Sequence, residues 1–175
     1  PGISHLAGAK QGVQQAQPQL FKADVDLLLD GDELLQEEVF GPATLVIEVE
    51  DQAQLGAAVQ ALRGQLTATL IGEPAELLAH GWLSELLQEK VGRLLLNGYP
   101  TGVEVCDAMV HGGPYPATSD ARGTSVGTAA IDRFLRPVCF QNYPDELLPA
   151  VLQNANPLGL LRLIDGEYSR AEIAG

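Results

Sequence analysis

Two adjacent carboxylates, Glu37 and Glu38, precede an aromatic ring, Phe40, and a Gly41-Pro42 corner. A carboxylate can accept hydrogen bonds from sugar hydroxyls, and an aromatic ring can cover a flat heterocycle. Gly41 would let the backbone approach a ligand closely, and Pro42 fixes the entry into the apolar run that follows. The segment therefore predicts a binding site at the edge of a sheet. Because loop carboxylates are usually solvated, an acidic helix end with a buried phenylalanine and an ordinary turn also explains these residues.

Strand and helix patterns alternate after this motif. Apolar and β-branched runs predict strands over residues 44–49, 66–71 and 93–97, the first of them with the profile of a buried strand. Apolar residues at helical spacing predict a helix over residues 52–63 and a second one from Pro74 to near Lys90, a cation suited to a helix C-terminus. Short joints between these elements imply right-handed crossovers and a parallel sheet that helices cover on both faces. We therefore expect an α/β fold with three layers.

The remaining segments are less regular. The first 20 residues show little periodicity, and we assign no element to them. Short helical segments are predicted over residues 32–36, 127–135 and 145–148, and a last strand over residues 138–143. The tail, residues 154–175, is expected to be an extension packed on a surface.

The segment that follows the third strand is a second candidate site. Residues 97–127 are rich in glycine and proline, which is typical of an irregular functional loop. In a parallel sheet ligands bind beyond the carboxyl ends of the strands, where we expect this segment to lie. Within it, His111 could act as a general base, but no partner is visible, and a loop histidine bonded to backbone is favoured.

The two cysteines are weak candidates for chemistry. A nucleophilic cysteine is activated by a neighbouring base, a cation or a helix N-terminus. Cys106 instead precedes Asp107, and Cys139 lies in the last predicted strand, so structural burial is favoured for both. The three histidines and two cysteines lack the spacing of metal ligands, and we predict no metal site.

Charge and hydropathy exclude several classes of partner. The net charge is −13 with only 10 lysines and arginines, so a phosphate backbone or an anionic membrane would be repelled. No apolar run approaches the roughly 18 residues that a membrane span requires. We expect a cytoplasmic protein with no nucleic-acid and no membrane partner.

The motif and the elements after it resemble the C-terminal part of the catalytic domain of aldehyde dehydrogenases. The resemblance rests on residues 36–42 (Q-E-E-V-F-G-P), the strand–helix pattern, Asn97-Gly98 and Gly113-Pro114, in the family's order. Residues 97–105 and 109–118 are similar to the NADP-preferring branch that includes the α-ketoglutarate semialdehyde dehydrogenases. The resemblance covers nearly everything from about Gln17 to Tyr143, and the tail fits the same branch.

The resemblance implies roles for individual residues. Glu38 corresponds to the glutamate that hydrogen-bonds the nicotinamide ribose of NADP or NAD, and Phe40 to the aromatic ring beside the nicotinamide. The wall of the aldehyde tunnel corresponds to five loop residues: Tyr99, Thr101, Val103, Cys106 and His111.

The same resemblance implies an enzyme larger than this chain. The nucleophilic cysteine, the glutamate general base, the oxyanion-binding asparagine and the dinucleotide-binding domain are expected upstream of Pro1, so we assign no catalytic residue here and expect the chain alone to be inactive. The full enzyme would form a thiohemiacetal with a small aldehyde, reduce the cofactor and hydrolyse the thioester to a carboxylate. Residues 1–135 would be the C-terminal portion of the catalytic domain. Residues 136–175 would be an oligomerisation strand and extension of a dimer or tetramer. The alternative is a non-catalytic remnant that acts as an assembly module.

Overall fold

The structure is a computed structural model that describes residues 2–10, 15–100 and 102–173. It divides into two compact units, Pro1–Leu135 and Arg136–Gly175. The roles expected for these two parts of the chain, a catalytic portion and an oligomerisation extension, remain predictions.

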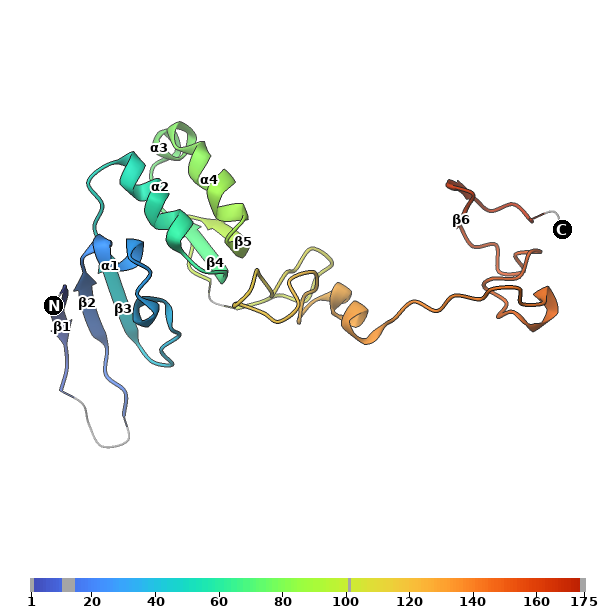
Figure 1. Cartoon of the computed structure of the whole chain (residues 1–175), viewed down its shortest axis with the longest axis horizontal. Helices are drawn as coiled ribbons and strands as arrows, with labels where there is room; N and C mark the ends of the chain where they lie inside the picture. Colours follow the sequence, from blue (N-terminus) through green and yellow to red (C-terminus); the bar gives the residue numbers. More distant parts are fainter. Residues whose placement is uncertain (1, 11–14, 101, 174–175) are drawn as a thin grey trace. The chain divides into compact units, whose positions relative to one another are not determined.

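The first unit begins with a three-stranded sheet of β1 (Ile3–Gly8), β2 (Gln19–Ala23) and β3 (Ala43–Ile47), in that order (Figure 1). β1 runs antiparallel to β2, and β2 runs parallel to β3. Between β2 and β3 the chain forms α1 (Val25–Leu29) and a short 3-10 helix, η1 (Glu33–Gln36). β2, these helices and β3 therefore make one parallel crossover unit, as expected for an α/β fold.

A second parallel unit follows in the sequence. β4 (Gln65–Leu70) pairs with β5 (Val91–Leu96), and α3 (Pro74–Ala79) and α4 (Gly81–Gln88) connect the two strands. α2 (Gln52–Ala61) links β3 to β4, and its N-terminus is capped by the Asp51 carboxylate, which accepts from the Gln54 N–H at 2.8 Å. Apolar residues of α2, α4, β4 and β5 form one cluster around Val59, Leu83 and Leu87. The hydrophobic stripes of the two helices thus cover one face of the β4–β5 pair.

The α/β class is confirmed, and each strand and helix predicted between residues 44 and 97 is present, with the last helix divided in two near His80. The expected sheet of three consecutive strands is wrong, because β3 pairs with β2 and not with β4. Its partner is the apolar stretch around Leu20 and Phe21, which lies where no element was assigned. The three-layer arrangement stays a prediction.

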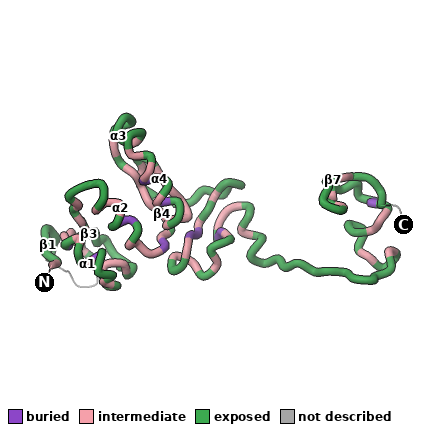
Figure 2. Tube along the Cα trace, turned by 45° about the horizontal axis from the view of Figure 1, so that its top comes forward, coloured by how far each residue is buried: buried purple, intermediate pink, exposed green. Residues whose placement is uncertain are grey.

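Burial is sparse in the described parts of the chain (Figure 2). The buried hydrophobic residues are Ala23, Leu28, Ala58, Val59, Leu83 and Leu87. β3 half-buries Leu45 and Ile47 and exposes Thr44 and Val46. The expected buried strand is therefore wrong for this chain, because only one side of β3 is covered.

The rest of the first unit is mostly irregular and ends in a 3-10 helix, η2 (Thr128–Phe134), which confirms the short helix predicted there. The second unit contains η3 (Asp145–Leu147) and a hairpin of β6 (Arg162–Ile164) and β7 (Glu167–Ser169). Residues 138–143 form no strand among those described, so the predicted last strand is wrong.

Polar contacts hold the second unit together. Asn156 is its buried residue, and the side chain bonds the backbone of Leu160 and Arg170. The Arg162 guanidinium donates to backbone carbonyls, at 2.6 Å to that of Gln153 and at 3.2 Å to that of Asn154. In neither unit does the described chain contain a helix long and apolar enough to cross a membrane.

Candidate functional site

The motif loop, residues 37–41, joins η1 to β3 and is anchored at both ends. At its far end the Pro42 carbonyl accepts a 2.9 Å hydrogen bond from the N–H of Gln19, the first residue of β2. Between the anchors Glu38 is exposed, and Phe40 is 92% exposed. The alternative interpretation of a buried phenylalanine is therefore wrong for this chain. Both side chains are accessible to a ligand.

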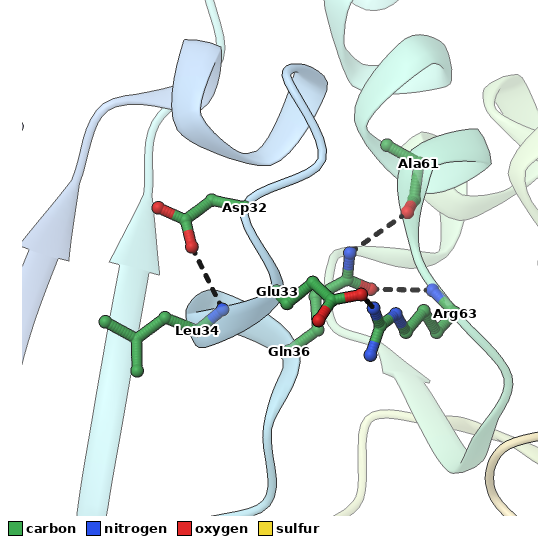
Figure 3. Close-up of polar contacts among 6 residues, drawn as sticks. All are labelled: Asp32, Glu33, Leu34, Gln36, Ala61 and Arg63. Atoms are coloured by element: carbon green, nitrogen blue, oxygen red, sulfur yellow. Dashed lines mark hydrogen bonds and ion pairs between the residues drawn. The ribbon is translucent and has the colours of Figure 1, made fainter.

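The near end of the loop is tied to the C-terminus of α2 by Gln36 (Figure 3). The Gln36 side-chain amide donates to the Ala61 carbonyl at 3.2 Å, and its oxygen accepts from the Arg63 N–H at 2.7 Å. Glu33 and Arg63 add an ion pair at 2.5 Å. The Ala61 carbonyl is one of those that a helix C-terminus leaves without an intrahelical partner, and Gln36 satisfies it.

Lys90 satisfies the neighbouring carbonyls of the same helix end. Its ammonium donates to the Gln60 carbonyl at 2.7 Å and to the Leu62 carbonyl at 2.9 Å. A cation at a helix C-terminus is also favoured by the helix dipole. Lys90 follows α4, as predicted, but the helix that its ammonium caps is α2. Side chains from two distant segments therefore hold the end of α2 in place.

A glycine-rich contact closes the same region. Gly64 lies against the backbone of Pro114 and Tyr115, and Gly92 lies against the carbonyl of Gly112. A Cβ atom at either glycine would fall well inside van der Waals contact, so only glycine permits this approach. Residues 112–115 are thereby held at the amino ends of β4 and β5. The prediction that the segment after β5 lies beyond the carboxyl ends is therefore wrong for residues 112–115, which lie at the opposite ends of these strands.

A cleft of about 610 Å³ lies at these amino ends. Residues 35–38, 62–67 and 116–117 line it, so it includes Glu38 and the backbone that follows α2. Among the described residues no hydrogen bond engages the Glu38 carboxylate, which leaves its oxygens able to accept from a hydroxyl-bearing ligand. Phe40 is not part of the lining and stands at the other end of the short loop.

The expected tunnel residues do not gather around this cleft. Tyr99, Val103 and Cys106 are exposed and do not line it, and Thr101 lies outside the described residues. His111 is half-buried, and its backbone N–H donates to the Thr124 hydroxyl at 2.8 Å. Their roles in an aldehyde tunnel remain predictions.

The burial expected for the cysteines is wrong. Cys106 and Cys139 are both exposed and free. Cys106 lies at a turn of the irregular segment, and the stretch around Cys139 has no strand partner that would cover it. Among the residues that the structure describes, no cluster of three or more His, Cys, Asp or Glu side chains could hold a metal ion.

Sequence reasoning missed the residues that support the motif. Gln36 was part of the motif but had no assigned role, and Arg63 was only the end of a helix. Gln36 bonds residues that are 25 and 27 positions away, so no local spacing reveals the contact. The position of Gln36 directly before Glu37 and Glu38 was the one feature of the sequence that could have indicated a supporting role.

Comparison with known proteins gives the following relationships. No family model matches the chain. It is 58% identical over 158 residues to the α-ketoglutaric semialdehyde dehydrogenase of Acinetobacter baylyi. The aligned residues make up 90% of this chain and 30% of that protein. It is 49% identical over 170 residues to α-ketoglutaric semialdehyde dehydrogenase 2 of Azospirillum brasilense, which covers 95% of this chain and 32% of that protein. The chain thus spans about a third of the length of these relatives, in their C-terminal part.

Proposed function

Because the chain is homologous to a C-terminal part of aldehyde dehydrogenases and belongs to that family, we propose that it is part of an NAD(P)-dependent enzyme that oxidises a semialdehyde to a carboxylate. The identity to two α-ketoglutaric semialdehyde dehydrogenases carries this proposal. It makes α-ketoglutaric semialdehyde the first substrate to test. A non-catalytic assembly module is not favoured, because both relatives are named as dehydrogenases.

The residues of the motif loop fit a dinucleotide cofactor. Glu38 offers carboxylate oxygens at a cleft of about 610 Å³, and a carboxylate pairs well with ribose hydroxyls. Phe40 presents a ring that is 92% exposed, so one face can lie against a flat heterocycle. Both properties follow from the exposed loop itself and hold equally for NAD and NADP.

In the proposed enzyme this chain positions the cofactor. The bound nicotinamide would supply the hydride acceptor. Glu38 would hold the ribose next to it by accepting hydrogen bonds, and Phe40 would keep water from one side of the ring. The nucleophile and the dinucleotide-binding domain would belong to the part of the enzyme that corresponds to the remaining two thirds of the relatives.

Assembly into a homo-oligomer is a further part of the proposal. In the second unit Val138, Phe140 and Tyr143 are exposed along an extended segment that pairs with no strand among the described residues. Large exposed apolar side chains on a small unit are typical of a surface that another protein surface covers. We assign this surface to a second copy of the enzyme.

The test is an assay of the full-length protein with α-ketoglutaric semialdehyde and either NAD or NADP. The readout is the absorbance of the reduced cofactor. We expect Glu38→Gln to lower kcat/KM for the cofactor about ten- to a hundredfold, as for the loss of a hydrogen bond to a charged group. Glu85→Gln, at an exposed glutamate of α4 that does not line the cleft, is the matched control and should stay near the wild type.

Two results would contradict the proposal. If no aldehyde supports cofactor reduction by the wild-type protein, the assigned activity is wrong. If Glu38→Gln and Glu85→Gln behave alike in an active enzyme, the activity stands but Glu38 is not the ribose ligand.

A further inference from the structure

Gln36 joins two distant segments through both atoms of its carboxamide. One side of the group donates to the Ala61 carbonyl at 3.2 Å, and the other accepts from the Arg63 N–H at 2.7 Å (Figure 3). These two backbone groups flank Leu62, the C-cap of α2. A carboxamide held at its donor and its acceptor is fixed in direction as well as in distance. Gln36 therefore sets the angle at which the chain leaves η1.

The ion pair between Glu33 and Arg63 adds a second connection between η1 and the segment that follows α2. It joins the first residue of η1 to the segment that Gln36, the last residue of η1, also bonds. The Arg63 and Glu33 side chains are 37% and 74% exposed, so the pair alone adds little stability. Together, Gln36 and the ion pair connect both ends of η1 to the segment that follows α2.

The active part of the motif starts directly after this tie. Glu38 is two residues beyond Gln36, and Phe40 two residues further. In the described chain no side-chain bond engages residues 37–41, and the next anchor to another element is the Pro42 carbonyl. The direction of Glu38 therefore depends on Gln36 on one side and on Pro42 on the other.

From this geometry we propose that Gln36 is a positioning residue for the cofactor, which it serves by aiming Glu38 and Phe40. The Glu33–Arg63 pair supports it. The inference rests on the proposed function and adds residues to that site. Gln36 lines the same cleft, but both polar atoms of its carboxamide are taken up by the backbone of Ala61 and Arg63, so we assign it no hydrogen bond to the cofactor. A displacement of about 1 Å at a reacting group can cost a hundredfold in rate, so loss of a distant tie can be large.

A purely structural role for Gln36 makes a different prediction. If Gln36 is only structural, its replacement would lower the unfolding temperature. It would also reduce kcat/KM for the cofactor and for the aldehyde by the same factor, because fewer molecules would be active. If Gln36 is a positioning residue, its replacement should change the kinetic parameters of the cofactor selectively. It should also slow the chemical step relative to product release. A deuterium isotope effect with aldehyde labelled at the carbonyl carbon reports that change.

The experiment uses the full-length enzyme with Gln36→Ala, and with Gln88→Ala as the matched control. Gln88 also bonds a backbone carbonyl, that of Ser84 at 3.1 Å, but on an exposed turn of α4. We expect kcat/KM for NAD or NADP to fall about tenfold or more in Gln36→Ala, with a larger isotope effect and an aldehyde KM within about twofold of the wild type. Gln88→Ala should match the wild type in all three.

A charge exchange provides a second, independent series. Glu33→Arg and Arg63→Glu should each raise the cofactor KM, and the double variant should restore it in part, because the pair can re-form with opposite polarity. The same exchange at Lys22 and Glu48, an exposed pair at 2.5 Å between β2 and the end of β3, should leave the cofactor KM unchanged. This series decides the question if Gln36→Ala does not fold.

Each outcome separates the inference from the function that it rests on. A wild-type protein without activity overturns both. An active wild type with equal kinetics in Gln36→Ala and Gln88→Ala overturns the positioning role and leaves the activity intact. Equal losses for cofactor and aldehyde, with a lower unfolding temperature, would show that Gln36 is only structural. A cofactor-selective loss with rescue in the charge exchange supports the proposal.

Discussion

The two ends of the β4–β5 pair are held by different means. At the amino ends backbone packs directly on backbone, where Gly64 meets Pro114 and Tyr115, and Gly92 meets Gly112. The nearest atoms to an added Cβ at Gly64 or Gly92 all belong to main chain, which adjusts less readily than a side chain. Any added atom must displace main chain.

At the carboxyl ends one side chain makes the connection. The Asn97 carboxamide donates to the Gly72 carbonyl at 2.9 Å and accepts from the Gly72 N–H at 2.9 Å, and the Asn97 N–H bonds the Leu70 carbonyl at 2.8 Å. The carboxamide imitates a peptide group and extends the ladder by one residue. Beside it lies a mostly apolar cleft of about 600 Å³, lined in part by Leu70, Leu77 and Leu96.

The candidate cofactor site lies at the amino ends of β4 and β5, where main chain packs on main chain. Gln36 and Lys90 bond to the α2 end within the same region, and the cleft with Glu38 opens there. A site that must hold groups within fractions of an ångström gains from a support with no adjustable parts. We infer that the main-chain packing at the amino ends keeps the residues of the site in fixed positions. The Asn97 contacts at the carboxyl ends only extend the hydrogen bonding between β4 and β5.

The largest effect is expected at Gly64. Gly64→Ala places a Cβ atom inside the backbone of Pro114, and we expect a loss of about 3 kcal/mol or more in the free energy of unfolding. Gly81→Ala is the matched control, because nothing lies within 4 Å of its added Cβ and it begins α4. That change should be neutral or stabilising by up to about 1 kcal/mol. Thermal unfolding of the full-length protein measures both, and equal unfolding temperatures would remove the distinction between the two ends.

A smaller effect is expected at Asn97. Its φ is 48°, a left-handed conformation that asparagine and glycine tolerate better than alanine. Asn97→Ala loses both carboxamide bonds and adds this strain, so we expect a cost of about 2 kcal/mol. Asn97→Gly loses the bonds without the strain and should cost roughly half as much. If Asn97→Ala is as harmful as Gly64→Ala, the carboxyl ends are no more tolerant than the amino ends.

The elements of the two crossover units were predictable to different degrees. β4 and β5 follow from local runs such as Leu94-Leu95-Leu96, and α2 follows from its cap at Asp51 and its apolar spacing. The pairing of β2 with β3 did not follow, because the five residues of β2, Gln19–Ala23, are too few to show a period that indicates a strand. Pairing is decided by which apolar edge is available in three dimensions, and a one-dimensional pattern does not contain that information.

The candidate site was predictable only in its chemistry. Glu38 and Phe40 were identified by residue type and by resemblance, and neither argument places Glu38 in a cleft. The cleft depends on Gln36 bonding a helix end 25 positions away and on two glycines that admit residues 112–115. The prediction that Cys139 is buried failed for a related reason. An apolar sequence indicates that a residue can be buried, but it does not show that another element covers it.

The smallest effect is expected at Lys90, where a side chain assists the amino ends. Lys90→Met keeps the aliphatic stem but removes the ammonium that bonds the Gln60 and Leu62 carbonyls. We expect a loss of roughly 0.5–1 kcal/mol in the free energy of unfolding, because the ammonium is partly solvated and its interaction with the helix end is screened. Lys10→Met, at an exposed lysine outside the described helices and strands, is the control.

Salt separates the Lys90 contribution from the backbone contacts next to it. The cost of Lys90→Met should shrink in part in about 1 M salt, where a Debye length of roughly 3 Å screens the interaction of the ammonium with the helix dipole, while the cost of Gly64→Ala should not change. A Lys90→Met variant that unfolds as early as Gly64→Ala would mean that the amino ends depend on a side chain as much as the carboxyl ends do. A small, salt-dependent loss would instead show that Lys90 contributes less than the main-chain packing at Gly64 to the stability of this region.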